Sequence, residues 1–125
     1  TRQTMNTNAK GYRNETKTKE YLEALGFKCI NTVRSSYKGS NDFFGLFDTI
    51  AVCDRPEGID MWTDWLEPKM SFMITIECGE TLYVQTTSNR NKPKAVREAI
   101  AAFPATNKQI FIWYDRIKEP KIISL

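Results

Sequence analysis

Oxygen-bearing side chains stand at three separated points of the chain, where folding could bring them around one divalent cation. Glu15 lies in a segment of good helix formers, whereas Asp48 and Gln85 lie in two different apolar segments. Mg²⁺ prefers carboxylate, amide and carbonyl oxygens in a near-octahedral shell. We therefore predict a Mg²⁺ or Mn²⁺ site with Asp48 and Gln85 as ligands. The main-chain carbonyl of Thr86 is a further ligand, and Glu15 would hold a metal-bound water or a second ion.

The absence of histidine limits the chemistry available to the chain. It excludes Ser-His-Asp and Cys-His catalysis, histidine-dependent ribonuclease chemistry and histidine-ligated metal sites. Cys29, Cys53 and Cys78 form no Cys-x-x-Cys pair, and each lies in an apolar stretch. We predict reduced thiols in the core rather than a zinc site.

Charge is distributed unevenly along the 125 residues, although the formal net charge is only +3. Residues 1–38 hold eight Lys and Arg against three Asp and Glu, residues 39–85 hold two against nine, and residues 86–125 hold eight against three. An acidic middle between basic ends suits a carboxylate metal site within a phosphate-binding surface. Segregation of this kind also arises by chance on solvated faces. The basic side chains expected to bind nucleic acid are Lys10, Arg13, Lys17, Arg34, Lys38, Arg90, Lys92, Lys94 and Arg97.

Phosphodiester hydrolysis needs a cation that stabilises the anionic transition state and generates hydroxide. It also calls for a positively charged side chain that orients the attacking water. Lys94, in the basic segment after Gln85, is our first choice for that side chain. Arg97, Lys19 and Arg34 are the alternatives.

Aromatic residues in the segment before Asp48 have two interpretations. Tyr37, Phe43 and Phe44 could stack on bases or wedge open a junction. Phe43 and Phe44 could equally be core or dimer contacts. No segment resembles a base-reading motif, so we expect structure-selective or non-specific binding through phosphates.

Hydrophobic periodicity predicts a single domain over residues 1–125 that mixes helices and strands. A helix over 10–25 ends at Gly26, and a second helix begins at Pro93 and ends before Pro104. The strands are predicted over 27–33, 46–53, 71–78, 81–88, 108–114 and 121–124.

Three further expectations concern the segments between and before these elements. Gly79 and Glu80 should join the strands over 71–78 and 81–88 into a hairpin. Residues 54–69 form a polar insertion, in which Trp62 and Trp65 would attach a short helix or loop to the core. Residues 1–9 are expected to be disordered.

No apolar run approaches the length of a membrane span, and the polar, basic first residues do not resemble a signal peptide. We therefore expect a cytoplasmic protein, in the host cytoplasm if the chain is viral, and no membrane partner.

Three stretches of sequence resemble a known family in their order. KGYRNETKTKEYLEALGFKC has a Gly-xxx-Glu helix and an LxxxGF exit, RSS…DFFGLFDTIAV carries an aspartate near a strand start, and LYVQTTSNRNKPKAVREAI joins a strand to a helix. Together they resemble the PD-(D/E)XK nuclease superfamily, in particular archaeal Holliday-junction-resolvase-like and phage or plasmid nuclease-like proteins. The resemblance places Glu15, Asp48 and Gln85 at the metal positions, with Asp42 assisting.

The resemblance implies a fold and an activity. The fold would be α/β, a restriction-endonuclease-like central mixed β-sheet flanked by helices. The activity would be Mg²⁺-dependent endonucleolytic hydrolysis of DNA, with structure-selective cleavage of branched DNA as in resolvases. The protein would be a homodimer, because two symmetric cuts need two sites.

The second motif departs from the family pattern, in which an acidic residue stands two positions before a lysine. Gln85 and Thr87 occupy those two catalytic positions here. Glutamine removes one negative charge, and threonine removes the cation that positions the nucleophile. A catalytically inactive nucleic-acid-binding protein of the same fold is therefore the alternative hypothesis. A third is a protein-interaction or inhibitor domain of a mobile element, with its partner bound near Trp62 and Trp65.

Overall fold

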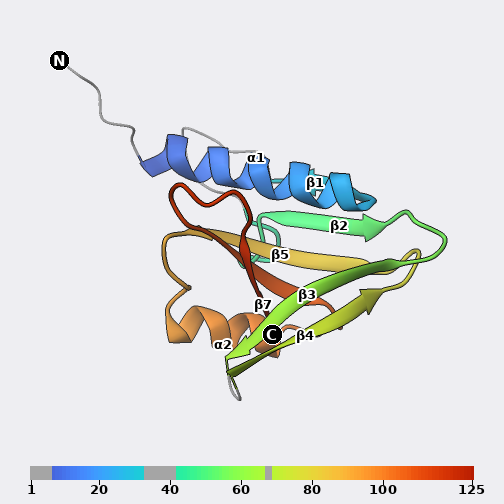
Figure 1. Ribbon diagram of the computed structural model, residues 1–125. Helices are drawn as coiled ribbons and strands as arrows, with labels where there is room; N and C mark the ends of the chain where they lie inside the picture. Colours follow the sequence, from blue (N-terminus) through green and yellow to red (C-terminus); the bar gives the residue numbers. More distant parts are fainter. Residues whose placement is uncertain (1–6, 33–41, 67–68) are drawn as a thin grey trace.

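The computed structural model describes residues 7–32, 42–66 and 69–125, which form two helices and one seven-stranded sheet (Figure 1). The elements are α1 (Thr7–Leu25), β1 (Phe27–Asn31), β2 (Thr49–Cys53), β3 (Ile59–Leu66), β4 (Lys69–Ile76), β5 (Thr81–Ser88), α2 (Lys94–Ala102), β6 (Lys108–Trp113) and β7 (Lys121–Ser124). The predicted α/β class with a mixed sheet is confirmed.

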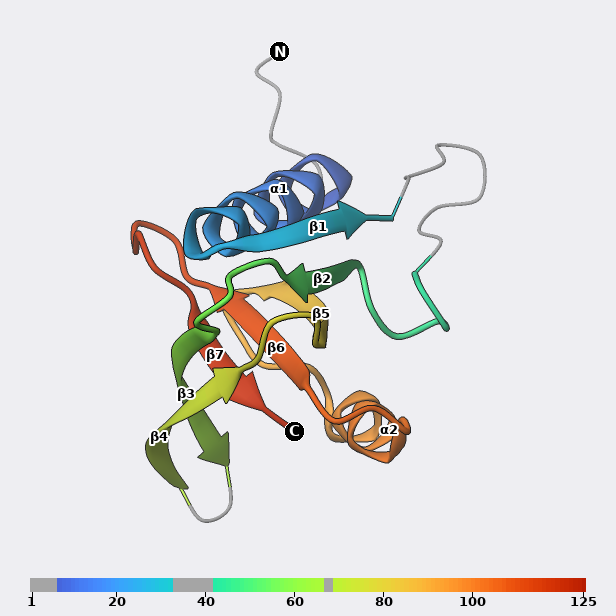
Figure 2. The ribbon, with the colours of Figure 1, turned by 90° about the vertical axis from the view of Figure 1, so that its right-hand side faces the viewer.

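The strand order across the sheet is β1-β2-β5-β6-β7-β3-β4. Neighbouring strands are antiparallel except for β5 with β6 and β3 with β7, which are parallel. Helix α2 connects the parallel pair β5 and β6, as parallel strands require a crossover. Figure 2 shows α1 and α2 on opposite sides of the central strands.

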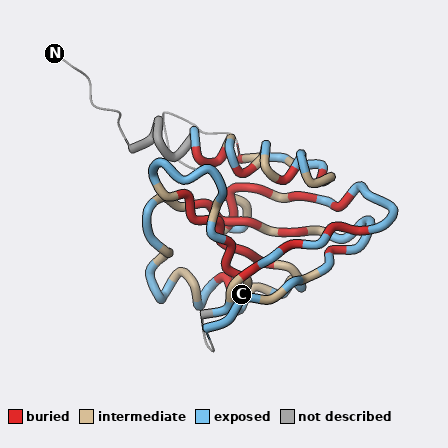
Figure 3. The backbone as a smooth tube through the Cα atoms, in the orientation of Figure 1, coloured by how far each residue is buried: buried red, intermediate tan, exposed pale blue. Residues whose placement is uncertain are grey.

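A separate apolar cluster fills the space on each face of the sheet. The cluster below α1 contains Leu22 together with Leu82 and Val84 of β5, and the cluster below α2 contains Ile100 together with Ile110 of β6. Tyr83 of β5 packs against the second cluster, so alternate residues of β5 face different cores, as the two-residue period of a strand requires. Figure 3 shows the buried positions concentrated along these central strands.

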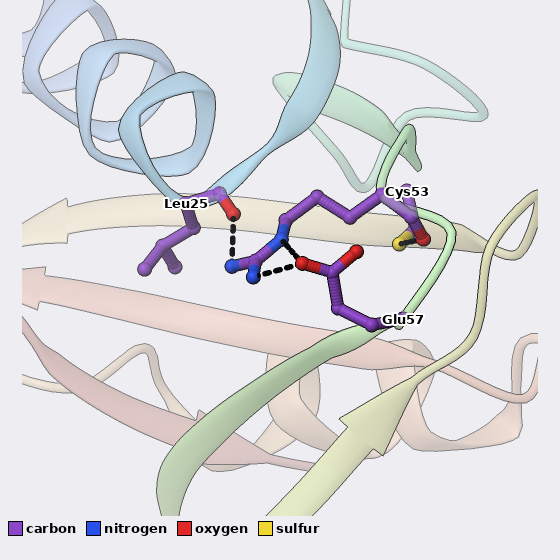
Figure 4. A network of polar contacts seen from close by, with 4 residues as sticks. Leu25, Cys53 and Glu57 are labelled. Carbon is purple, nitrogen blue, oxygen red and sulfur yellow. Dashed lines mark hydrogen bonds and ion pairs between the residues drawn. The ribbon is translucent and has the colours of Figure 1, made fainter.

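Basic side chains from elsewhere in the chain bind the carboxyl ends of both helices. Arg55 donates to the Leu25 carbonyl at the end of α1 (3.4 Å) and also pairs with Glu57 (Figure 4). Gly26 follows with φ +118°, and a Cβ there would lie 2.3 Å from Cδ of Arg55. Lys108 donates to two carbonyls near the end of α2, at 2.7 and 2.8 Å. Both contacts satisfy carbonyls that the last helical turn leaves unpaired.

The short helix or loop predicted within residues 54–69 was wrong, because strand β3 occupies half of this segment. Ile59, Met61 and Thr63 alternate inward as buried residues, and the strand pairs with β4 along its whole length. Pro56 and Gly58 belong to the turn before the strand. The polar residues between the buried ones obscured the alternation in the sequence.

The predicted hairpin of residues 71–78 with 81–88 was also wrong. A turn does form, in which the Glu80 N–H donates to the Glu77 carbonyl. The strands on either side of it nevertheless separate, since β4 lies at the sheet edge beside β3 and β5 lies between β2 and β6. Pairing with distant strands buries both faces of β5, which a local hairpin would not do.

Smaller corrections concern the first helix and the cysteines. Helix α1 begins at Thr7, so the expected disorder fails for residues 7–9, and residues 1–6 lie outside the described part. The cysteines of the described chain are free thiols, but Cys78 is exposed rather than part of the core. In the described ranges, neither helix combines the length and apolarity needed to cross a membrane.

Candidate metal and nucleic-acid site

The candidate site lies at one end of the sheet, where β2 begins beside β5. Asp48 immediately precedes β2, and its Oδ2 accepts the N–H of Thr86 at 3.0 Å. The N–H of Asp48 donates to the Val84 carbonyl at 3.0 Å. Asp48 is therefore bonded to the backbone of β5 on both sides of Gln85 and lies beside this part of the strand.

Glu15 approaches from α1, whose buried stripe changes character along its length. Leu22 faces the apolar core near the carboxyl end, whereas Asn14, Glu15 and Thr18 are the buried positions toward the amino end. Glu15 is 5% exposed and Asp48 is 2% exposed. The side chain of Asn31, at the end of β1, donates to the Glu15 carbonyl at 3.2 Å and fixes this part of the helix to the sheet.

A chain of hydrogen bonds links α1 to β5, the strand whose Thr86 N–H binds Asp48. The indole N–H of Trp113 donates to the Thr18 hydroxyl at 2.8 Å, and that hydroxyl lies 2.9 Å from the hydroxyl of Thr86. The Thr18 hydroxyl also contacts the Asn14 carbonyl at 3.1 Å. These bonds satisfy buried polar groups and set the position of the helix relative to β5.

The electrostatic environment of Asp48 is unusual for a carboxyl group. Burial, and next to it the negative charge of Glu15, raise the pKa of Asp48 to about 8. The Thr86 N–H lowers this pKa, Asp42 raises it, and Lys92 lowers it. The carboxyl therefore holds a proton at neutral pH when no cation is bound. A bound divalent cation would replace that proton.

Gln85 is held by the segment just before Asp48. Its Nε2 donates to the Leu46 carbonyl at 2.6 Å, which leaves Oε1 as the end of the amide that can bind a cation. Thr86 contributes its N–H to Asp48, and Thr87 is half-buried two positions beyond Gln85 on the same face of β5. The hydroxyl of Thr87 carries no positive charge, so a cation that orients water at this site would have to come from another element.

The lysine whose charge acts on Asp48 is Lys92 rather than Lys94. Lys92 is half-buried in the loop before α2, and its carbonyl accepts Nε of Arg97 at 3.0 Å. Lys94 is exposed and lies 3.9 Å from Glu98, its partner one turn along α2. Our first choice for the cation thus forms a surface ion pair, whereas the charge of Lys92, two residues earlier, lowers the pKa of Asp48.

The other predicted nucleic-acid contacts have several environments. Arg13 and Arg90 are exposed, and the ammonium of Lys17 lies 5.4 Å from the centre of the Trp113 ring. Lys10 belongs to α1, at a position where only the backbone is described. The predicted contacts Arg34, Lys38 and Tyr37 lie outside the described residues.

The donor atoms at the site fit a hard cation. Among the described residues, no three Asp, Glu, Cys or His side chains are grouped to hold a metal by themselves. A cation beside Asp48 would therefore also need the amide oxygen of Gln85 or main-chain oxygen. Oxygen ligands of this kind suit Mg²⁺ and Mn²⁺ and do not suit zinc.

Comparison of the sequence with family models, with curated proteins and with solved structures gives no match. The functional argument consequently depends on the geometry of the described residues. Sequence reasoning missed Thr18 and Trp113 as supports of the site, and it listed Lys92 only as a phosphate contact. The polar residues at 14, 15 and 18 on one helix face were the signal that could have indicated the buried polar chain.

Proposed function

We propose that this chain is a Mg²⁺- or Mn²⁺-dependent endonuclease that hydrolyses phosphodiester bonds of DNA. The observation that carries the proposal is the burial of Asp48 beside Glu15, which raises the pKa of Asp48 to about 8. A buried carboxyl group beside a second negative charge lowers the free energy of unfolding when it ionises, and a bound divalent cation would offset that loss. Perturbed acids of this kind occur preferentially at functional sites.

The order of the elements supports a restriction-endonuclease-like core. Helix α1 is followed by β1, β2 and β5, which are antiparallel neighbours, and α2 then crosses to the parallel strand β6. The β3–β4 hairpin is inserted between β2 and β5 in sequence and lies at the far edge of the sheet (Figure 1). The inserted hairpin therefore does not interrupt the pairing of β1, β2 and β5 near the carboxylates.

The proposed roles follow from the contacts. Asp48 and Gln85 hold the cation, with Glu15 binding a water molecule or a second ion. The cation would stabilise the phosphate in the transition state and promote ionisation of water. Thr86 orients the Asp48 carboxylate through its N–H, and Lys92 supplies the positive charge that Thr87 lacks.

Cleavage assays test this proposal directly. Linear duplex, single-stranded and four-way-junction DNA should be cut in the presence of Mg²⁺ or Mn²⁺ and remain intact in EDTA. Asp48→Asn should lose cleavage while retaining DNA binding, whereas Asp60→Asn, at an exposed aspartate of β3, should cleave normally. Equal cleavage by the Asp48 variant would contradict the proposal. Preferential cutting of the junction would require a homodimer, which light scattering measures.

The second candidate is an inactive nucleic-acid-binding protein of the same fold. Thr87 favours it, because the lysine position of the second motif carries no charge. This candidate predicts salt-sensitive DNA binding with no metal-dependent cleavage of any of the three substrates.

A further inference from the structure

The turn before Asp48 contains an aromatic residue in an unfavourable backbone conformation. Phe44 has φ +57° and Gly45 has φ +69°, and the N–H of Phe43 donates to the Phe47 carbonyl at 2.6 Å across the turn. Two successive residues with positive φ are typical of a turn that favours Asn-Gly. A bulky aromatic side chain at the first position is a strained choice that demands another reason.

The environment of the Phe44 ring indicates what that reason is. The ring rests against Phe103, with centroids 4.9 Å apart, and lies 6.4 Å from the ring of Tyr83. Phe47 lies beneath, fully buried, and packs against both of these rings. Phe44 itself remains 68% exposed. The half-buried rings of Phe103 and Tyr83 thus support it, while most of its surface is turned to solvent.

The position of Phe44 relates it to the candidate site. It stands four residues before Asp48, and the same turn contributes the Leu46 carbonyl that holds Gln85. Among the described residues, positive φ at a non-glycine also occurs at Asn89 and Arg116. These two loops follow β5 and β6, whose parallel ends coincide, and Asn89 bonds with Asp115. The Phe44 ring lies instead toward the start of β5, because it rests on Tyr83 and on Phe103, which follows the end of α2.

We propose that Phe44 stacks on an unpaired nucleobase of a DNA strand that crosses the candidate site. The inference rests on the proposed function and specifies its substrate class as DNA with an exposed base, either single-stranded or at a branch. A base within a continuous duplex is covered on both faces by its neighbours, so an exposed ring reaches only an unpaired or unstacked one. A ring supported by half-buried neighbours loses little freedom on stacking, which favours binding.

Binding measured without cleavage tests this inference. The probes are a single strand that contains the fluorescent base 2-aminopurine, the matching duplex and a four-way junction, all in EDTA. Phe44→Asn suits the turn and removes the ring, and we expect it to weaken single-strand and junction binding by about tenfold and to abolish quenching of the 2-aminopurine. Duplex affinity should change by less than a factor of about two. Phe44→Tyr should retain binding and quenching.

Trp62→Ala supplies the matched control. Trp62 is 65% exposed on β3, close to the exposure of Phe44, but three strands away from β5 in the sheet. It should bind all three probes normally, and thermal unfolding would verify that each variant is folded. Unchanged single-strand binding by Phe44→Asn, an equal loss for duplex and single strand, or no DNA binding by the wild-type protein would each overturn the inference.

The outcomes separate this inference from the proposed catalysis. DNA cleavage that does not depend on Phe44 would leave the nuclease proposal intact and overturn the stacking role. Phe44-dependent quenching without cleavage under any metal condition would support stacking and contradict catalysis.

Discussion

Replacing Asp48 by asparagine should remove a large pH dependence of stability. The substitution keeps an oxygen that accepts the Thr86 N–H, but it removes the titrating proton and the repulsion from Glu15. The pKa of Asp48 is about 8 in the folded chain and 3.8 is its ordinary value. Between these two pH values the native protein holds one proton more than the unfolded chain.

The sign and size of the effect follow from this difference. The contribution of the protonated Asp48 carboxyl to the free energy of unfolding is fully present below about pH 4. It falls by about 1.4 kcal/mol for each pH unit above that and is lost by about pH 8. The loss over the whole window is about 6 kcal/mol, which is comparable to the total stability of a small domain. Asp48→Asn avoids this loss, so its advantage over the wild type should grow with pH and then become constant.

Urea unfolding followed by the fluorescence of the buried Trp113 measures this advantage across the pH window. Asp60→Asn should follow the wild-type profile. Mg²⁺ should stabilise the wild type more at the alkaline end than at the acidic end, because the cation binds the ionised carboxylate, and it should not stabilise Asp48→Asn. Parallel pH profiles for the wild type and Asp48→Asn would refute the argument that burial beside Glu15 controls this carboxyl.

Three other substitutions test individual contacts. Lys92→Ala should reduce the cleavage rate by about 100-fold, whereas Lys94→Ala should cleave DNA normally; a reversed order in single-turnover assays would restore Lys94 as the catalytic cation. Thr18→Val leaves the Trp113 N–H unsatisfied and should lower the free energy of unfolding, measured in urea, by about 1–3 kcal/mol. Thr18→Ser keeps the hydroxyl and should lower it less, and equal losses for the two variants would mean that the hydroxyl contributes nothing. Lys108→Met removes both hydrogen bonds to the end of α2 and should destabilise the chain by about 2–4 kcal/mol, and an unchanged urea midpoint would contradict this role.

The sequence predicted those parts of the fold whose pattern is local. The Leu22 stripe of α1 and the apolar run of β6 identified their elements, and Gly26 marked the end of the first helix. Strand β3 was missed because Asp60, Trp62 and Asp64 interrupt its inward-facing residues. The partner of β4 was missed because strand pairing depends on segments far apart in the sequence, which no local pattern specifies.

The candidate site was predictable in its residues but not in its contacts. Asp48, Glu15 and Gln85 were identified as a set by their order and chemistry. The proximity of Lys92 to Asp48 depends on the path of the loop before α2, and the support from Thr18 depends on how the helix rotates against β5. Both depend on tertiary structure, so the sequence alone could not distinguish Lys92 from Lys94.

The placement of the β3–β4 hairpin has a consequence for how the chain folds. Its two strands are adjacent in sequence, so the hairpin requires only a short loop to close, whereas the neighbours of β5 are brought together over long separations. We expect the hairpin to form early and the centre of the sheet to assemble late. The carboxyl groups of Glu15 and Asp48 would then meet only when the surrounding core is nearly complete. Above about pH 8, where Asp48 ionises, their repulsion would therefore speed unfolding more than it slows folding.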